Sequence, residues 1–303
     1  MPAELVLLAD ALVRATPLII AGLAVALAFQ GGVFNIGAEG QLLVGAIAST
    51  ATTLAFAGSL GAAVILVALP AAAIAGAFWA GIAAELRRRF HVLEIISTIM
   101  LNFIAIHLVS YLVRGPLQEP TRIYPQTESL PAAAHLPILL PGTRLHAGFA
   151  IAVLMAGTLS WMLKKTAIGF RIRATGASPL AAEVSGRIDI NTTSFNVFLA
   201  SGALAGIAGG IEVSGVTFAL YENLSPGYGY TAIAVALIAG LNPLGIIASG
   251  VFFGMLETGA SALQREFAIP SSLAFVVEAA LILAALTIAA LRGRRLPGRL
   301  SPS

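Results

Sequence analysis

The feature that most constrains the fold is Leu60–Ala84, a run of 25 residues without a charged side chain. A helix of about 20 apolar residues crosses the ~30 Å hydrocarbon core of a membrane. Further apolar runs alternate with short polar segments along the chain, which is 58% hydrophobic and 10% charged, with a mean hydropathy of +0.93. Soluble domains carry about 25% charged residues. The sequence therefore predicts an all-α polytopic membrane protein.

About nine transmembrane helices are expected within a single transmembrane domain, residues 1–303. Ahead of them, Glu4–Val13 mixes apolar and charged residues, which is typical of a helix lying at the membrane interface. The predicted spans, in chain order, are Pro17–Gln30, Ala38–Ala57, Leu60–Ala84, Val92–Val113, Ala147–Leu163, Thr193–Val213, Thr231–Leu241, Gly245–Ala262 and Ser271–Leu291.

The distribution of Lys and Arg predicts the orientation of these spans. Twelve of the 17 basic residues fall in segments that nine spans place on one side, and five fall on the other. Basic residues accumulate in cytoplasmic loops, so the segment 164–190 and the C-terminus are predicted to be cytoplasmic. The proline-rich segment 114–146 is then an external loop. No basic leader precedes the first span, so we expect no cleaved signal peptide.

Two irregular stretches interrupt the apolar runs. Gly31–Gln41 contains four glycines together with Asn, Glu and Gln, and Val216–Tyr230 is the second such stretch. Polar irregular backbone is tolerated at membrane depth only where protein buries it or where it lines a water-filled cavity. Broken helices of this kind form the central sites of many transporters. The alternative for Gly31–Gln41 is a short loop just outside the bilayer.

The positions of the two breaks predict an inverted repeat. Residues 1–113 form the first repeat and residues 191–303 the second, and each repeat is broken near its beginning. In transporters built this way, the solute path lies where the two repeats meet.

Five polar residues are the candidates for this path, and each has a structural alternative. Asn35 and Glu39 belong to the first break, where Glu39 would also complement the N-terminus of the second span without touching solute. Asn102 should face the protein interior, towards either solute or another helix. Tyr228 and Tyr230 could stack on a nucleobase or simply anchor the membrane interface.

Glycine recurs at every fourth residue of the sixth span, at positions 202, 206 and 210. Such a face allows another helix to approach to backbone contact. We interpret these glycines as packing residues that do not touch solute.

The segment 164–190 contains a short predicted helix, Pro179–Ser185. Ser178 can cap its N-terminus, proline suits its first turn, and Gly186 can end it in a left-handed conformation. Because so short a helix is not stable alone in water, it must dock either on its own bundle or on a partner protein.

Three strings resemble the permease subunits of ATP-binding-cassette (ABC) importers, in the branched-chain amino acid/ribose-type permease family. They are Gly32-Val-Phe-Asn-Ile-Gly-Ala-Glu-Gly-Gln41, Ile96-Ser-Thr-Ile-Met-Leu-Asn102 and Ala181-Ala-Glu-Val-Ser-Gly186. The first is most similar to the nucleoside-importer branch. Permeases of this kind usually begin with a further transmembrane helix, ahead of the stretch that matches Leu12–Pro17.

This resemblance implies a multi-subunit importer of the cell (inner) membrane that translocates a small polar solute, most simply a nucleoside or otherwise a simple sugar. The implied partners are a second permease subunit, ABC ATPase subunits, an external solute-binding protein and the lipid bilayer, with no nucleic acid. The residues implied in ATPase coupling are Ser178, Pro179, Ala181, Ala182, Glu183 and Gly186.

The residues agree with a transport subunit that is not an enzyme. No Gly-x4-Gly-Lys-Ser/Thr occurs, so ATP should bind a partner and this chain should hold no cofactor. The absence of cysteine excludes thiolate chemistry, and neither Gly-x-Ser-x-Gly nor His-Glu-x-x-His is present. An ion-coupled secondary transporter remains the rival class, because acids in or beside the spans could relay protons. These acids are Glu39, Glu94, Glu212, Glu257 and Glu278.

Overall fold

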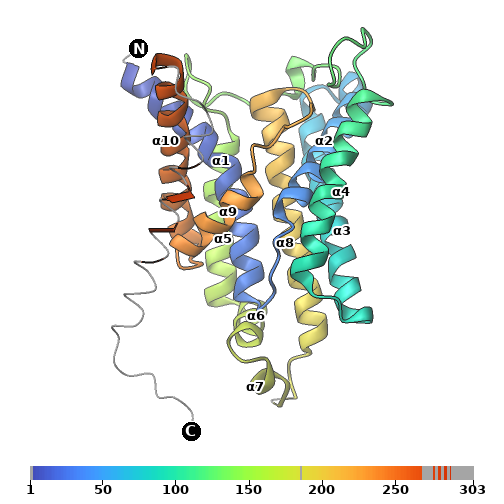
Figure 1. Cartoon of the computed structure of the whole chain (residues 1–303), viewed down its shortest axis with the longest axis vertical. Helices are drawn as coiled ribbons and strands as arrows, with labels where there is room; N and C mark the ends of the chain where they lie inside the picture. Colours follow the sequence, from blue (N-terminus) through green and yellow to red (C-terminus); the bar gives the residue numbers. More distant parts are fainter. Residues whose placement is uncertain are drawn as a thin grey trace.

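A computed structural model describes residues 3–184 and 186–267, with residues 276, 279–280, 283–284 and 287. Over these residues the chain is a helical bundle whose only β pairings are isolated bridges (Figure 1). Five segments are long and apolar enough to cross a membrane, or six if the bent pair α5–α6 counts as one. The predicted all-α polytopic fold is confirmed.

Helix α1 (Ala3–Gln30) lies at the middle of the bundle and packs against α5, α8, α9 and α10. The prediction of an interfacial helix over Glu4–Val13 is wrong, because these residues and the first span form one continuous helix. Pro17 lies inside it, and neighbouring helices allow proline within membrane helices. The charge of Arg14 is matched by Glu257 of α10, with Nη1 and Oε2 3.9 Å apart.

Helices α2 (Ala38–Leu60) and α3 (Ile65–Phe90) form a hairpin through the 3-10 turn η1 (Gly61–Val64). Both cross the same part of α8, where Gly206 lies against Gly45 of α2 and Gly76 of α3. The third span extends further than predicted, since α3 includes the basic cluster and ends only where His91 adopts a left-handed conformation.

The remaining helices follow the predicted order, with two differences. First, a separate helix, α6, follows α5 at a bend of 77°, where a single loop was expected. Second, the segment η3 directly after α8 is a π-helix. Their bounds are α4 (Glu94–Arg114), η2 (Ala132–Ala134), α5 (Gly148–Lys165), α6 (Ala167–Ala177), α7 (Pro179–Val184), α8 (Ile190–Glu212), η3 (Val213–Thr217), α9 (Tyr228–Ile238) and α10 (Pro243–Phe267).

The predicted seventh span, Thr231–Leu241, is not a full span. Helix α9 has 11 residues, so its length of about 16 Å is half the thickness of the hydrocarbon core. The stretch 218–227 before it is irregular, and in Figure 1 it runs from one end of the bundle into the interior. The last predicted span, Ser271–Leu291, lies largely outside the described residues.

The glycine face of α8 packs as predicted. Added Cβ atoms at Gly202 and Gly206 would collide with the backbone of α3, and one at Gly209 would collide with the carbonyl oxygen of Leu42 in α2. Gly210 is less crowded, with its nearest side-chain atom at 3.0 Å. Helix α8 is therefore clamped between both helices of the hairpin.

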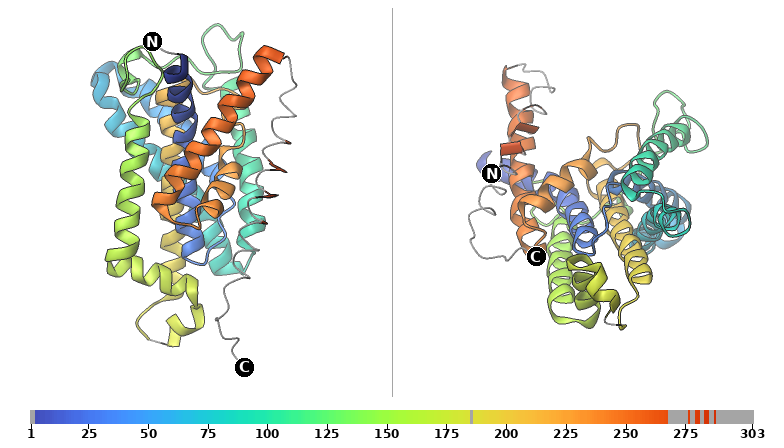
Figure 2. Two further views of the ribbon diagram at one scale, coloured as in Figure 1. Left: turned by 90° about the vertical axis from the view of Figure 1, so that its left-hand side faces the viewer. Right: turned by 60° about the horizontal axis from the view of Figure 1, so that its bottom comes forward.

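The two ends of the bundle differ in composition. We call the end that carries Arg87–Arg89, Lys164–Lys165 and α6–α7 the basic end, and the end that carries residues 115–147 the loop end (Figure 2). At the loop end, backbone hydrogen bonds tie residues 127–136 to residues 214–220 just after α8. The repeat boundaries 1–113 and 191–303 stay a prediction.

Candidate functional site

The two breaks meet inside the bundle. Helix α2 follows the irregular stretch 31–37, helix α9 follows 218–227, and both begin in the interior (Figure 1). Gly229, in the first turn of α9, lies so close to the backbone of Glu39, in the first turn of α2, that a Cβ there would collide with the Glu39 nitrogen. Two helix N-termini, each carrying a partial positive charge, thus converge on one place.

Asn35 ties the first break to two other elements. Its Nδ2 donates to Gln41 Oε1 at 2.9 Å and to Ser201 Oγ of α8 at 2.8 Å. Its Oδ1 accepts from the Gly37 N–H and from Gln41 Nε2, both at 2.9 Å. Ser201 in turn donates to the Ala24 carbonyl of α1 at 2.7 Å. Every hydrogen-bonding position of the buried Asn35 amide is filled from within the chain.

Glu39 caps the helix of the opposite break. Its Oε2 accepts from the Gly229 N–H at 2.7 Å, and its carboxylate also hydrogen-bonds Ser225. Ser225 Oγ accepts from the N–H groups of Gly227 and Tyr228, at 3.1 and 3.0 Å. Glu39 is 3% exposed, so this carboxylate and the Ser225 hydroxyl together satisfy the first N–H groups of α9.

Asn102 of α4 joins both breaks. Its Oδ1 accepts from the Gly40 N–H in α2 at 2.9 Å, and its Nδ2 donates to the Ile36 carbonyl at 3.0 Å and to the Tyr230 hydroxyl at 3.2 Å. Asn102 is fully buried, as predicted, and its contacts are with other helices of the same chain.

The structure thus places four of the five residues predicted to line the path, Asn35, Glu39, Asn102 and Tyr230, where the two breaks meet. The side chain of Tyr228, the fifth, interacts electrostatically with Glu212 and Glu257 instead. Tyr230 is 41% exposed, whereas Asn35, Glu39, Asn102 and Tyr228 are buried. Solute could reach the buried amides and carboxylate only if the two helix starts separate. The role of these residues in the solute path stays a prediction.

Two of the acids that a proton-coupled transporter would need also lie together. Glu212, at the end of α8, is buried and interacts electrostatically with Glu257 of α10 and with Arg14 of α1. The π-helix η3 follows Glu212 directly, and such bulges frequently occur at functional sites. Sequence reasoning identified both acids but gave no reason to pair them with Arg14.

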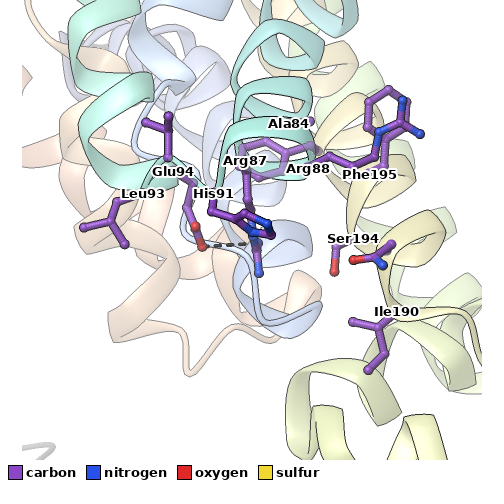
Figure 3. A pocket seen from close by; sticks show the side chains of 12 residues that line it. Ala84, Arg87, Arg88, His91, Leu93, Glu94, Ile190, Ser194 and Phe195 are labelled. Atoms are coloured by element: carbon purple, nitrogen blue, oxygen red, sulfur yellow. Dashed lines mark ion pairs between the residues drawn. The ribbon is translucent and has the colours of Figure 1, made fainter.

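A cavity at the basic end was not anticipated from the sequence. It has a volume of about 410 Å³ and lies between the end of α3, the start of α4 and the start of α8. Figure 3 shows Arg87 and Glu94 on one side of it and Ser194 and Phe195 on the other. The feature of the sequence that could have indicated this cavity is the basic cluster before His91, which we used only to predict orientation.

The short helix α7 forms as predicted but faces differently. Ser178 Oγ accepts from the Ala181 N–H at 3.4 Å, and Gly186 follows in a left-handed conformation. Ala182, one of the residues implied in ATPase coupling, is only 5% exposed and packs within the chain. Leu180 and Val184 are instead 73% and 80% exposed. Pro179, Ala181 and Glu183 are exposed as well.

At the loop end, His146 fixes the start of α5. Its Nδ1 accepts from the Gly148 N–H at 3.1 Å, and its ring fills the space left by Gly148 and Gly215. Burial, with Arg144 nearby, lowers the pKa of His146 to about 4, so the ring is neutral at physiological pH. At the same end of the bundle, His135 stacks on Phe218 with ring centroids 3.9 Å apart.

Comparison with known proteins extends this picture. Residues 7–286 match the family described as branched-chain amino acid transport system / permease component. The chain is 40% identical over 287 residues to a glucose ABC transporter permease protein of Haloferax volcanii, covering 91% of this chain and 75% of that protein.

Two further relatives are named for nucleosides. A guanosine ABC transporter permease protein of Bacillus subtilis is 36% identical, over 92% of this chain and 81% of its own length. A nucleoside ABC transporter permease protein of Lactococcus lactis subsp. cremoris is 31% identical, over 88% of this chain and 75% of its own length.

Proposed function

Because this chain belongs to the family of branched-chain amino acid transport system permease components, we propose that it is the permease subunit through which an ABC importer moves a nucleoside across the cell membrane. The observation that carries the proposal is the meeting of two half-helix N-termini inside a bundle of membrane helices. A second permease subunit, ATPase subunits and an external solute-binding protein complete the importer.

A simple sugar is the second candidate solute, because the glucose permease relative is 40% identical. Aromatic side chains beside the breaks favour a nucleoside: Tyr230 and Phe34 are 41% and 51% exposed and could stack on a nucleobase. The test is uptake of radiolabelled guanosine and glucose by proteoliposomes that contain the complete importer and its binding protein. Uptake of glucose that guanosine does not inhibit would overturn the nucleoside assignment.

ATP should drive the transport from partner subunits, with no cofactor bound to this chain. The rival is proton coupling through acids such as the neighbouring Glu212 and Glu257. Uptake in the same proteoliposomes should require ATP on the ATPase side and persist when a protonophore collapses the proton gradient. Loss of uptake on collapse, with ATP still present, would favour the secondary transporter.

We assign the basic end and the C-terminus to the cytoplasm, following the positive-inside rule. The loop end then faces outward, where the solute-binding protein docks. Because the chain has no cysteine, single cysteines report accessibility without background labelling. In intact cells an impermeant maleimide should label the exposed Thr121→Cys at the loop end and spare the exposed Ala177→Cys at the basic end. The reverse pattern would invert the topology.

Coupling to the ATPase is proposed to use the outward face of α7. Leu180 and Val184 present exposed apolar side chains on a helix that Ala182 anchors to the bundle. Leu180→Glu places a charge in this contact and should abolish co-purification of the ATPase and solute-stimulated ATP hydrolysis, while Leu180→Ile preserves both. Normal hydrolysis in the Leu180→Glu complex would show that the contact lies elsewhere.

A further inference from the structure

The end of α6 touches the first break at the level of the backbone. Gly176, in the last turn of α6, lies so close to the end of α1 that an added Cβ would be 2.0 Å from the carbonyl oxygen of Gln30 and 2.9 Å from the nitrogen of Gly32. From the other side, a Cβ on Gly32 would lie 3.1 Å from the Cα of Gly176. Gly32 has a φ of +72°, a conformation that favours glycine. No side chain of these two residues therefore separates α6 from the first break.

Helix α6 is joined to α7 without a flexible linker. Ser178 alone lies between the two helices and hydrogen-bonds both of them. Its N–H donates to the Ala174 carbonyl of α6 at 3.1 Å, and its own carbonyl accepts from the Ala182 N–H of α7 at 3.0 Å. A displacement of α7 is therefore passed to the end of α6, which is the part of α6 in contact with the first break.

Gln30 extends this contact to the helix that follows the second break. Its Nε2 donates to the carbonyl oxygen of Leu241, in the turn between α9 and α10, at 2.5 Å. At the other end of α9, Glu39 accepts from the Gly229 N–H. Residues on the two sides of the first break thus hold α9 at both of its ends. Because the carbonyl of Gln30 is also the group that packs against Gly176, one residue contacts α6 and holds α9.

We propose that Gly176, Gly32 and Gln30 form a junction at which movement of α6–α7 reaches both breaks together, with Gln30 as the positioning residue for α9. The proposal rests on the transport function and the ATPase contact proposed above, and it adds the residues that make the two breaks move as one unit. Close-packed contacts are barely compressible, so a contact between backbone atoms passes on a displacement that a mobile side chain would absorb.

The first test is Gly176→Ala in the complete importer. Alanine suits a helix, so α6 itself accepts the change, but the new Cβ pushes α6 away from the Gln30 carbonyl. The ATPase should still co-purify and hydrolyse ATP at its basal rate. Stimulation of that rate by solute-loaded binding protein should fall severalfold, and uptake should fall with it. The matched control is Gly157→Ala in α5, whose Cβ meets nothing within 4 Å and which should leave stimulation and uptake unchanged.

The second test removes the hydrogen bond from Gln30 with little change in packing. Gln30→Met is similar in length but has no donor for the Leu241 carbonyl, whereas Gln30→Lys keeps one. The readout is the ratio of stimulated to basal hydrolysis in the assembled complex. A merely structural role would lower the yield of Gln30→Met and leave this ratio unchanged. We expect the ratio to fall severalfold in Gln30→Met and to be retained in Gln30→Lys.

Uptake by the unmodified importer is measured first, with guanosine and with glucose, and the solute that is taken up is used in both tests. Absence of uptake of both solutes overturns the proposed function. If uptake is present but Gly176→Ala keeps the wild-type ratio, the junction is wrong while the transport function stands. If Gly176→Ala does not assemble, Gln30→Met decides, and a wild-type ratio in that variant overturns the junction.

Discussion

At the centre of the bundle Asn35 hydrogen-bonds both Gln41 and Ser201, whereas at the basic end Asn191, Ser194 and Phe195 border open space. Both regions are polar and both lie between helices, so residue types alone do not distinguish them. The centre satisfies its polar groups from within the chain and holds the helices together. The cavity leaves its groups available to a ligand. The hydrogen-bond partners of a polar residue in a membrane bundle therefore indicate its role better than its residue type does.

The largest loss of stability is expected when the two helix starts at the centre are forced apart. Gly229→Ala adds a Cβ that collides with the backbone nitrogen of Glu39, which no side-chain movement can relieve. We expect no folded, monodisperse protein by fluorescence-detected size-exclusion chromatography. The control is Gly58→Ala in α2, whose added Cβ meets nothing within 4 Å. Gly58→Ala should be neutral or slightly stabilising, because alanine favours helix. Normal yield of Gly229→Ala would mean that the helix starts are not in contact.

An intermediate effect is expected when one central amide is removed. Asn35→Ala removes both side-chain hydrogen bonds of the buried Gln41 amide and the one that Ser201 Oγ accepts, and each buried group left unsatisfied costs about 1–3 kcal/mol. The unfolding temperature in detergent should fall by several degrees. At the cavity, Ser194→Ala should change stability by no more than about 0.5 kcal/mol. Equal losses in the two variants would remove the distinction between a closed centre and an open cavity.

The smallest effect concerns how helices start in the two regions. At the basic end α8 is capped by its own Asp189, which accepts from the Thr192 N–H at 3.1 Å, whereas α9 at the centre is capped in part by Glu39 of the other half. Asp189→Ala should lower the unfolding temperature by less than Asn35→Ala, and Asp189→Asn should retain most of the cap.

The Asp189 cap also predicts a pH dependence. Hydrogen bonds from Thr192 lower the pKa of Asp189 below its ordinary value of 3.8. A lowered carboxyl pKa contributes stability above the ordinary value, and that contribution is lost as the pH falls through the folded-state pKa. The gap in unfolding temperature between wild type and Asp189→Ala should therefore be constant above about pH 5 and narrow below pH 4. A gap that widens on acidification would contradict the cap.

Much of this fold could be predicted because apolar run length and glycine spacing act locally. The 25 uncharged residues over Leu60–Ala84 predict a span, and the glycines of α8 predict a close helix crossing. The failures are cases in which a distant contact overrode a local signal. The charges of Glu4, Asp10 and Arg14 suggested an interfacial helix, but these residues continue the first span as one helix, and Arg14 pairs with the distant Glu257.

For the site, the sequence predicted which residues cluster but not what they contact. The two breaks identified Asn35, Glu39 and Tyr230 as neighbours in space. That Glu39 caps α9, or that Asn102 bridges both breaks, depends on pairings across the chain that no spacing reveals. The cavity at the basic end was missed for the same reason, since its walls come from segments about 100 residues apart.

The reciprocal capping at the centre has a consequence for how the protein is made. Asn35 is synthesised 166 positions before its partner Ser201, and Glu39 is synthesised 190 positions before Gly229, whose N–H it accepts. At a synthesis rate of about 5–20 residues per second, that delay is roughly 10–40 s. During this time the first helices are already in the insertion machinery with a carboxylate and an amide unmatched. Either water or a membrane chaperone must hydrogen-bond these groups until the second half has been synthesised. The rate of translation therefore sets how long the polar groups of the first half stay without their native partners.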